Sequence, residues 1–298
     1  MFYILILSPK TNKEKKEVIM NVNEAITLFK YYQQSHQRKR TINSYQTLLS
    51  VFEQTYGNRS LESIQSDEIY QFLENISAQS AKSTRRLRYA QLKAFFNFII
   101  DKCHHDMKNP CNAPLLSKTF RMPRQVPRTI LEKETVDEMI YNSKNPRNRL
   151  ILELQARCGL RIGELLNIKA QDVSERKLTI KEPKSGKEAE FAFMPEPIAK
   201  RMSDYLKANN FLPGDHVFPI SYSTARMFIR KLGSKLNVPL SPHDLRRYSA
   251  TYASRNGVPL EIVSKVILRH QDLKTTQIYL GKVSEHEAIR WMDILHGK

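Results

Sequence analysis

The chain has 298 residues, of which 41% are hydrophobic and 26% charged, with a formal net charge of +18. That length is enough for two ordinary domains with separate cores, and the composition excludes a fibrous or disordered chain. The basic excess is present in both halves of the sequence. It favours a polyanion gripped from two sides, with binding that weakens as salt rises; a basic solubilising surface is the alternative.

The cysteines and the N-terminal stretch bear on the compartment. Cys103, Cys111 and Cys158 are odd in number and lack the spacing of a metal site, which favours reduced thiols in the cytoplasm. The apolar start over residues 1–7 is too short to span a membrane and lacks the flanks of a signal peptide. We expect residues 1–20 to form a flexible arm, with Met20 as an alternative start.

Residues 21–108 predict a helical domain. Apolar residues recur there at three- and four-residue spacing in four segments, which predicts four amphipathic helices. The first begins at Asn21, the second ends before Gly57, the third opens at Ser66, and the fourth runs from about residue 80 to 102. In the fourth helix we expect Leu87 inside and the neighbouring arginines outside.

Two basic clusters in this domain are candidates for phosphate contacts, which position a protein on DNA but do not read its sequence. A solvated surface is the alternative for both. The clusters are Arg38, Lys39 and Arg40, and Arg85, Arg86 and Arg88.

Residues 109–128 predict a linker. Pro110, Pro114, Pro123 and Pro127 break all periodicity there, and scattered basic residues accompany them.

Residues 129–298 predict a second, mixed domain. Helical patterns cover residues 129–141, 149–158, 195–206 and 223–236. Alternating segments at 177–180 and 190–193 flank a turn and predict a β-hairpin with Lys184 at its tip. The fold class is therefore mainly α with a small β-hairpin or sheet.

The segment 241–279 contains the candidate chemistry. Ser241 before Pro242 predicts a helix start, which places His243 and Arg246 on one face near a helix N-terminus. That combination suits a phosphate group. His270 and Tyr279 follow on a further helix–turn–helix unit, and a phenolic oxygen beside such a pocket can attack phosphorus.

The order of these motifs resembles the tyrosine site-specific recombinases of the phage-integrase and Xer class, over residues 21 to the C-terminus. Arg161 lies in a segment similar to the family's first-arginine box, and Lys184 is similar to its hairpin lysine, with Lys187 as a second candidate. The matching segments are Cys158-Gly159-Leu160-Arg161-Ile162-Gly163-Glu164-Leu165, His243-Asp244-Leu245-Arg246, Leu268-Arg269-His270 and Thr276-Gln277-Ile278-Tyr279.

The resemblance implies a clamp around double-stranded DNA, formed by a four-helix, SAM-like core-binding domain and an α+β catalytic domain. It implies cleavage through a 3′-phosphotyrosine, without a metal ion or other cofactor. The implied catalytic residues are Arg161, Lys184, His243, Arg246, His270 and Tyr279. The arginines would stabilise the transition state, the histidines donate hydrogen bonds or move a proton, and Lys184 protonate the leaving oxygen.

Two features need separate interpretation. Arg269 stands where the family commonly has glycine, and we expect it to contact DNA or point outward. A tail helix over 283–296 would dock on a neighbouring subunit, as in the family, or pack on its own domain. The first alternative implies a tetramer on two DNA sites, from a free monomer or dimer.

Two other functions are compatible with the fold: a catalytically silent DNA-binding regulator, and a type IB topoisomerase-like enzyme. The complete residue set argues against the regulator, and the short helical arm and tail against the topoisomerase. The compact, Xer-like chain suits integration or excision of a mobile element, or dimer resolution. Its tail is similar to that of archaeal integrases and Xer proteins.

Overall fold

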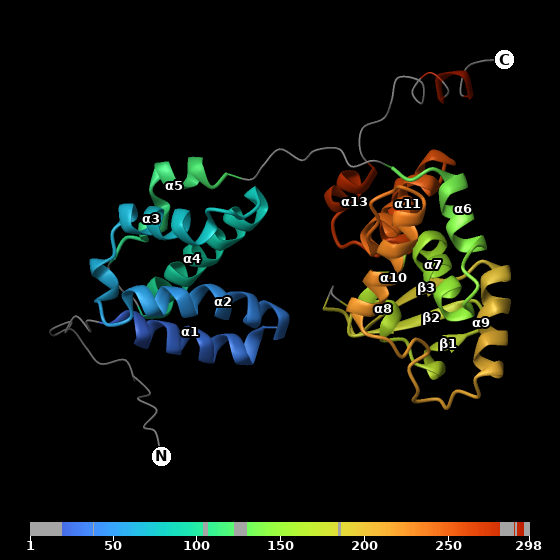
Figure 1. Cartoon of the computed structure of the whole chain (residues 1–298), viewed down its shortest axis with the longest axis horizontal. Helices are drawn as coiled ribbons and strands as arrows, with labels where there is room; N and C mark the ends of the chain where they lie inside the picture. Colours follow the sequence, from blue (N-terminus) through green and yellow to red (C-terminus); the bar gives the residue numbers. More distant parts are fainter. Residues whose placement is uncertain are drawn as a thin grey trace. The chain divides into compact units, whose positions relative to one another are not determined.

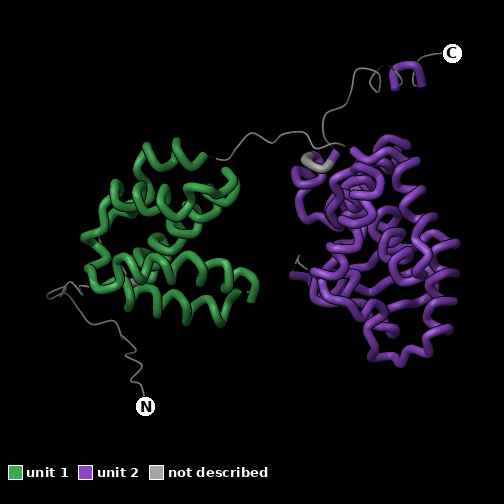
Figure 2. Tube along the Cα trace, in the orientation of Figure 1, with its two compact units in different colours: residues 1–125 green, residues 126–298 purple. Residues whose placement is uncertain are grey.

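The chain forms two compact units, residues 1–125 and 126–298, shown in the computed structural model of Figures 1 and 2. The structure describes residues 20–37, 39–103, 107–121, 130–183, 186–280, 289 and 291–294. It does not describe the side chains of Cys103, Ile278 and Tyr279. The arm predicted over residues 1–20 lies outside this description, except for Met20, which packs against the first core.

The first unit contains the four predicted helices. They are α1 (Val22–His36), α2 (Lys39–Tyr56), α3 (Ser66–Ser77) and α4 (Lys82–Cys103), with a short 3₁₀ turn at Leu61–Ser63. Asn21 caps α1: its side-chain oxygen accepts from the Glu24 N–H at 2.9 Å, and the Glu24 carboxylate accepts from the Asn21 N–H at 3.0 Å. The capping box of Asn21 and Glu24 therefore fixes the start of the helix, and its buried apolar residues fix the face that packs on the core.

The expected inside and outside faces of α4 were wrong at their N-terminal end. Leu87 is 51% exposed, whereas Arg88 is half-buried. At 100° per residue, position 87 lies about 140° from the buried Leu92, while position 88 lies about 40° from it. The helix phase set by the buried residues therefore turns Leu87 outward and Arg88 inward.

The linker predicted over 109–128 is also corrected. Residues Pro110–Asn112 form a 3₁₀ turn and Pro114–Thr119 form α5, and Cys111, Leu116 and Phe120 are buried in the first core. Pro110 and Pro114 occupy first helical positions, where the missing N–H costs nothing, so these two prolines start short helices instead of preventing them. Residues 122–129 lie outside the described part.

The second unit is mainly helical with one small sheet. Its longer helices are α6 (Lys133–Tyr141), α7 (Pro146–Cys158), α9 (Glu196–Ala208), α10 (Tyr222–Lys235), α11 (Pro242–Arg255) and α13 (Leu273–Leu280). Shorter turns are α8 (Ile162–Leu166), the 3₁₀ turn Ala170–Asp172, and α12 (Leu260–Ile262), which continues as a π-helical turn over Val263–Ile267.

The sheet has three antiparallel strands in the order β1 (Val173–Ser174), β2 (Lys177–Lys181) and β3 (Ala189–Phe193). The predicted hairpin is confirmed, with Ile180 opposite Glu190, whereas the two-residue β1 was not predicted. Figure 1 shows α7 at the centre of the unit, and α11 packs directly against it. Residues 150–152, 154 and 156 are each at most 2% exposed, so α7 is buried on most of its circumference.

Across the described ranges, no helix combines the length and the apolar character needed to cross a membrane.

Candidate active site

Arg246 on α11 connects the separate sequence motifs. Its side chain is 1% exposed, and its two terminal nitrogens donate hydrogen bonds to the main-chain oxygens of Gly159 and Leu268. Gly159 ends α7 in a left-handed conformation with φ of 63°, directly before the first-arginine box. One guanidinium therefore links that box, its own helix and the loop that leads to His270.

Arg161 precedes α8 and lies in a local ion pair with Glu164. Its Nη1 is 2.5 Å from Glu164 Oε1, and its backbone N–H donates to Oε2 at 3.0 Å. The Arg161 side chain is 24% exposed, whereas that of Glu164 is only 8% exposed. The buried carboxylate thus orients Arg161, whose side chain remains partly exposed.

His270 is 7% exposed and is held by a chain of hydroxyl groups. Its Nδ1 is 2.9 Å from Thr276 Oγ1, and the Thr276 hydroxyl donates to Ser264 Oγ at 2.9 Å. The Thr276 proton is directed at Ser264, so we assign the His270 proton to Nδ1, which leaves Nε2 as the acceptor. Sequence analysis missed both hydroxyls, although Thr276 is inside a recognised motif.

Burial and positive charge act together on His270. They lower the pKa of its imidazole to about 4: burial contributes most, followed by Arg246, Arg161 and Arg269, against an opposing effect of Glu164. His270 is therefore neutral at neutral pH. The same charges show that His270 lies in one electrostatic cluster with both predicted catalytic arginines.

His243 lies exposed at the second position of α11, one turn before Arg246. Ser241 is the N-cap residue, as expected, and forms a capping box with Asp244. The Asp244 carboxylate accepts from the Ser241 N–H at 2.9 Å and from its hydroxyl at 2.5 Å. Gln155 on α7 also donates to the Pro242 oxygen at 3.2 Å. The helix start that presents His243 is therefore held from two sides.

Tyr279 lies on α13, which packs against α11. Its side chain is outside the described part, as is Lys184 in the hairpin turn. Lys265 Nζ donates to the main-chain oxygen of Gln271 at 2.8 Å and fixes the loop that leads into α13. Arg161, Arg246 and His270 are thus brought together, with His243 on the helix of Arg246.

The expectation that Arg269 contacts DNA or points outward was wrong. Its side chain is 3% exposed, and its guanidinium donates to the Glu164 carboxylate and to the Ile267 main-chain oxygen, each at 2.8 Å. Burial of an arginine is tolerated only with such partners.

The predicted DNA-contacting cations differ in their surroundings. Lys39 and Arg40 are exposed at the start of α2, and Arg38 lies outside the described residues. Arg85 pairs with Glu74, and Arg88 donates to the Ile76 main-chain oxygen and, at 3.1 Å each, to the hydroxyls of Ser77 and Ser80. Arg86 instead lines an open groove of about 500 Å³ between α4 and α5, together with Lys93 and Arg121.

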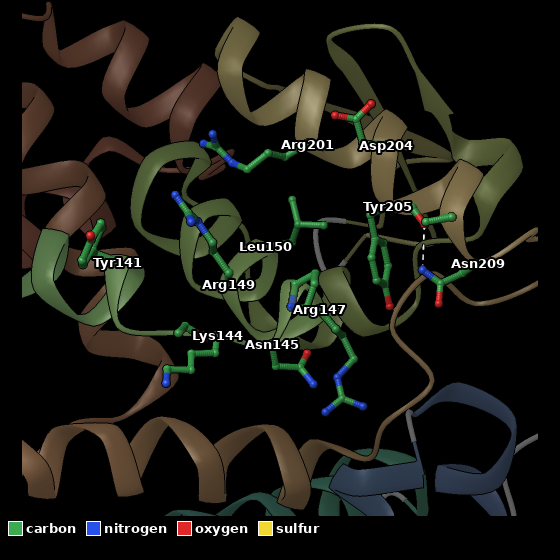
Figure 3. Close-up of a pocket in the computed structure, with 13 residues that line it drawn as sticks. Tyr141, Lys144, Asn145, Arg147, Arg149, Leu150, Arg201, Asp204, Tyr205 and Asn209 are labelled. Carbon is green, nitrogen blue, oxygen red and sulfur yellow. Dashed lines mark hydrogen bonds between the residues drawn. The ribbon is translucent and has the colours of Figure 1, made fainter.

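A larger cavity in the second unit, of about 710 Å³, contains none of the predicted catalytic residues (Figure 3). It lies between the end of α6, the start of α7 and α9. Arg149 and Arg201 at this cavity both pair with the buried Glu153, at 3.3 and 2.9 Å. Their charge is therefore partly satisfied within the fold.

Comparisons with known proteins identify the family of the chain. Residues 129–286 match the phage integrase family, and residues 26–102 match the phage integrase N-terminal SAM-like domain. The chain belongs to the phage integrase family. It is a Xer-like tyrosine recombinase, an enzyme that breaks and rejoins DNA.

Its relatives cover nearly the whole chain. Tyrosine recombinase XerA of Pyrococcus horikoshii is 29% identical, with 93% of this chain and 95% of that protein aligned. XerA of Pyrococcus furiosus is 28% identical over 89% of this chain and 92% of that protein.

Solved structures share the fold. The Tn1549 transposon integrase in complex with a circular intermediate DNA has a TM-score of 0.74 at 16% identity, covering 93% of this chain and 99% of that one. A lambda integrase tetramer bound to a Holliday junction has a TM-score of 0.70 at 15% identity, covering 90% and 80%.

Proposed function

We propose that this recombinase cuts DNA with Tyr279 and holds the scissile phosphate with Arg161, Arg246 and His243, with His270 beside it as a candidate proton acceptor. The observation that carries the proposal is the pair of hydrogen bonds from Arg246 to Gly159 and Leu268. Those contacts fix the first-arginine box and the His270 loop against the start of α11, where His243 is exposed. Three motifs far apart in sequence thereby face one small region.

The chemistry is a transesterification. The phenolic oxygen of Tyr279 forms a bond to phosphorus while the bond from phosphorus to the 5′ oxygen breaks, leaving a 3′-phosphotyrosine. Arg161 and Arg246 stabilise the charge on the non-bridging oxygens. A phenol has a pKa near 10, so its proton must be accepted during attack. The Nε2 of His270, neutral because its pKa is about 4, and the exposed His243 are the candidate acceptors.

The leaving 5′ oxygen needs a proton, which we assign to Lys184, with the exposed Lys187 as the second candidate. The ester conserves the energy of the broken bond. The 5′ hydroxyl of another strand can therefore attack it, which exchanges strands without a nucleotide cofactor.

The DNA contacts in the first unit come from cations that reach its surface. The half-buried Arg86 and Lys93 and the exposed Arg121 line one groove, and the exposed Lys39 and Arg40 extend the basic surface at α2. Arg85 and Arg88 would have to leave internal partners to reach a phosphate. We therefore assign the main phosphate contacts to the groove and the α2 start.

We further propose a tetramer on two DNA sites, the assembly that the lambda integrase structure shows on a Holliday junction. In the tail, Ile289, Met292 and Ile294 are 56–58% exposed, which suits docking on a neighbouring subunit. Trp291 lies near its own domain, since a Cβ added at Gly257 would be 3.0 Å from Trp291 Cη2. Truncation after Gly281 should abolish assembly on DNA. An unchanged assembly in light scattering would contradict the tail's role.

The decisive experiment is incubation with a nicked suicide duplex. A covalent protein–DNA adduct should form and disappear in Tyr279→Phe, while Tyr141→Phe, at an 80% exposed position, should leave it unchanged. Adduct formation without two-site products would favour a topoisomerase-like activity. Binding without any adduct would favour a silent regulator.

The biological role, integration and excision or dimer resolution, depends on the recognised site, which footprinting identifies. We place the reaction in the cytoplasm. The buried thiols of Cys111 and Cys158, which form no disulfide, suit that reducing compartment.

A further inference from the structure

Arg269 occupies a backbone conformation that normally belongs to glycine. Its φ is 51°, in the left-handed region, where a side chain carries a steric cost. The residue is also 6% exposed, which adds the cost of burying a guanidinium. An arginine can adopt this strained and buried conformation only if its contacts stabilise it enough to offset both costs. Those contacts therefore indicate its role.

The guanidinium of Arg269 joins three elements. It donates to the main-chain oxygen of Ile267 at 2.8 Å and approaches that of Gly159 at 3.4 Å. Its Nη2 is 2.8 Å from Glu164 Oε2 on α8, and its Nε is 3.8 Å from Glu190 Oε2 on β3. Arg269 thus lies between two nearly buried carboxylates, and only one of them also contacts Arg161.

Glu164 lies between two arginines, one on each oxygen. Arg161 contacts Oε1 at 2.5 Å and Arg269 contacts Oε2 at 2.8 Å. Burial alone would raise the pKa of this carboxyl, but the charges of Arg269 and Arg161 lower it overall, so it is ionised. A carboxylate beside a phosphate site repels the phosphate unless a cation neutralises it. Arg161 and Glu164 alone have no net charge, whereas Arg161, Glu164 and Arg269 together carry one positive charge. Glu190, whose carboxylate is 3.8 Å from Arg269 Nε, offsets that charge in part from the far side of Arg269.

We propose that Arg269 is a positioning residue for the cleavage reaction. It neutralises Glu164 from the buried side, so that Glu164 can orient Arg161 while Arg161 keeps its charge for the scissile phosphate. This inference rests on the proposed role of Arg161 as a phosphate ligand. It concerns a residue that no sequence motif assigns to the chemistry.

The test is a double-mutant cycle measured by single-turnover adduct formation on the suicide duplex at saturating DNA. Arg269→Gly suits the backbone and removes the cation, and it should slow the reaction by about tenfold or more. Glu164→Gln combined with Arg269→Gly should recover most of that loss, because the carboxylate that needs neutralising is gone. The matched control is Glu190→Gln with Arg269→Gly, which should not recover it.

A pH series separates this role from a purely structural one. In Arg269→Gly the pKa of Glu164 should rise, because among the described residues Arg161 is then the one cation that contacts its carboxylate. His270 and Glu190 are the other titratable groups of this cluster. The rate of the variant relative to wild type should therefore increase as pH falls, and Glu164→Gln should abolish that increase. Loss of a structural contact would predict no such dependence on Glu164.

Three outcomes overturn the proposal: a wild-type rate in Arg269→Gly, equal recovery by both glutamine variants, or no recovery in a double variant that unfolds at the wild-type denaturant midpoint. A wild-type chain without any Tyr279-dependent adduct would instead refute the proposed function. The same variants are then compared for duplex binding. If Arg269→Gly binds the duplex more weakly, and if Glu164→Gln but not Glu190→Gln restores its affinity, the electrostatic role is supported. Unchanged affinity in Arg269→Gly refutes it.

Discussion

The guanidinium of Arg246 donates a hydrogen bond to the main-chain oxygen of Gly159, 87 residues earlier in the chain. This contact requires that the chain turn sharply at Gly159 to end α7 and enter the first-arginine box. The left-handed φ of 63° provides the turn, and it is available to glycine at little steric cost. The geometry of the site thus depends on a residue that takes no part in the chemistry.

Gly159→Ala should therefore destabilise the second unit. A Cβ there would lie 2.8 Å from both Cγ2 and the main-chain oxygen of Ile267, in addition to the unfavourable φ. We expect a loss of about 1–3 kcal/mol or more in the free energy of unfolding, measured by urea titration. Gly163→Ala is the matched control. A Cβ at Gly163 meets nothing within 4 Å, and a helical alanine should be neutral or stabilising by up to about 1 kcal/mol.

Phe120→Ala should destabilise the first unit, because the segment expected to be a linker belongs to its core. The Phe120 ring is 2% exposed and stacks on Tyr89 at a centroid distance of 5.6 Å. Removing a buried phenyl ring costs about 3–5 kcal/mol. Thermal unfolding of the isolated segment 20–121 and its variant measures the loss, and an unchanged melting temperature would restore the linker interpretation. Leu115→Ala, at a 55% exposed position of α5, is the control.

Sequence reasoning succeeded for the long elements, since amphipathic periodicity located α1 to α4. The recurrence of short motifs also led us to expect that Arg161, Arg246 and His270 share one site, and the structure brings them together, while their roles in the chemistry stay a prediction. The failures have local causes. Prolines that start helices have the same composition as prolines that break them, and the inward turn of Arg88 depends on a helix phase set further along α4. The burial of Arg269 could not be predicted from sequence, because it depends on the left-handed φ of Arg269 and on the carboxylates of Glu164 and Glu190, which lie on other elements.

Arg86→Ala should weaken binding to duplex DNA and reduce the slope of log affinity against log salt by about 1, the effect of one lost phosphate contact. Fluorescence anisotropy across a salt series measures both quantities. Arg88→Ala is the comparison within the same cluster. Its guanidinium bonds to Ile76, Ser77 and Ser80, so its loss should lower the free energy of unfolding by about 1–3 kcal/mol and leave the salt slope unchanged. An equal change of slope in both variants would contradict this division.

The second unit should become less stable as the pH is lowered below 6.5, because His270 resists protonation in the folded chain. The pKa of His270 is about 4 in the folded chain, below its usual 6.5, so the unfolded chain binds the proton more readily between these values. Stability relative to His270→Gln should therefore be constant above pH 6.5 and decrease down to about pH 4, by a few kcal/mol in total. Urea unfolding of both proteins across this range checks the sign. A flat difference would show that the imidazole titrates normally.

Thr276→Val should release the His270 ring while conserving the shape of the side chain. The substitution removes the oxygen that lies 2.9 Å from Nδ1 and the donor to Ser264, leaving two buried polar groups without this partner. We expect a loss of about 1–3 kcal/mol in stability. We also expect slower adduct formation, because an imidazole free to change tautomer no longer presents Nε2 as an acceptor. Nitrogen-15 NMR of labelled histidine should show Nδ1 as the protonated nitrogen of His270 in wild type and a mixture in the variant. Thr276→Ser retains the hydroxyl and should restore both tautomer and rate; a Ser variant as slow as the Val variant would show that the methyl packing, and not the hydrogen bond, holds the ring.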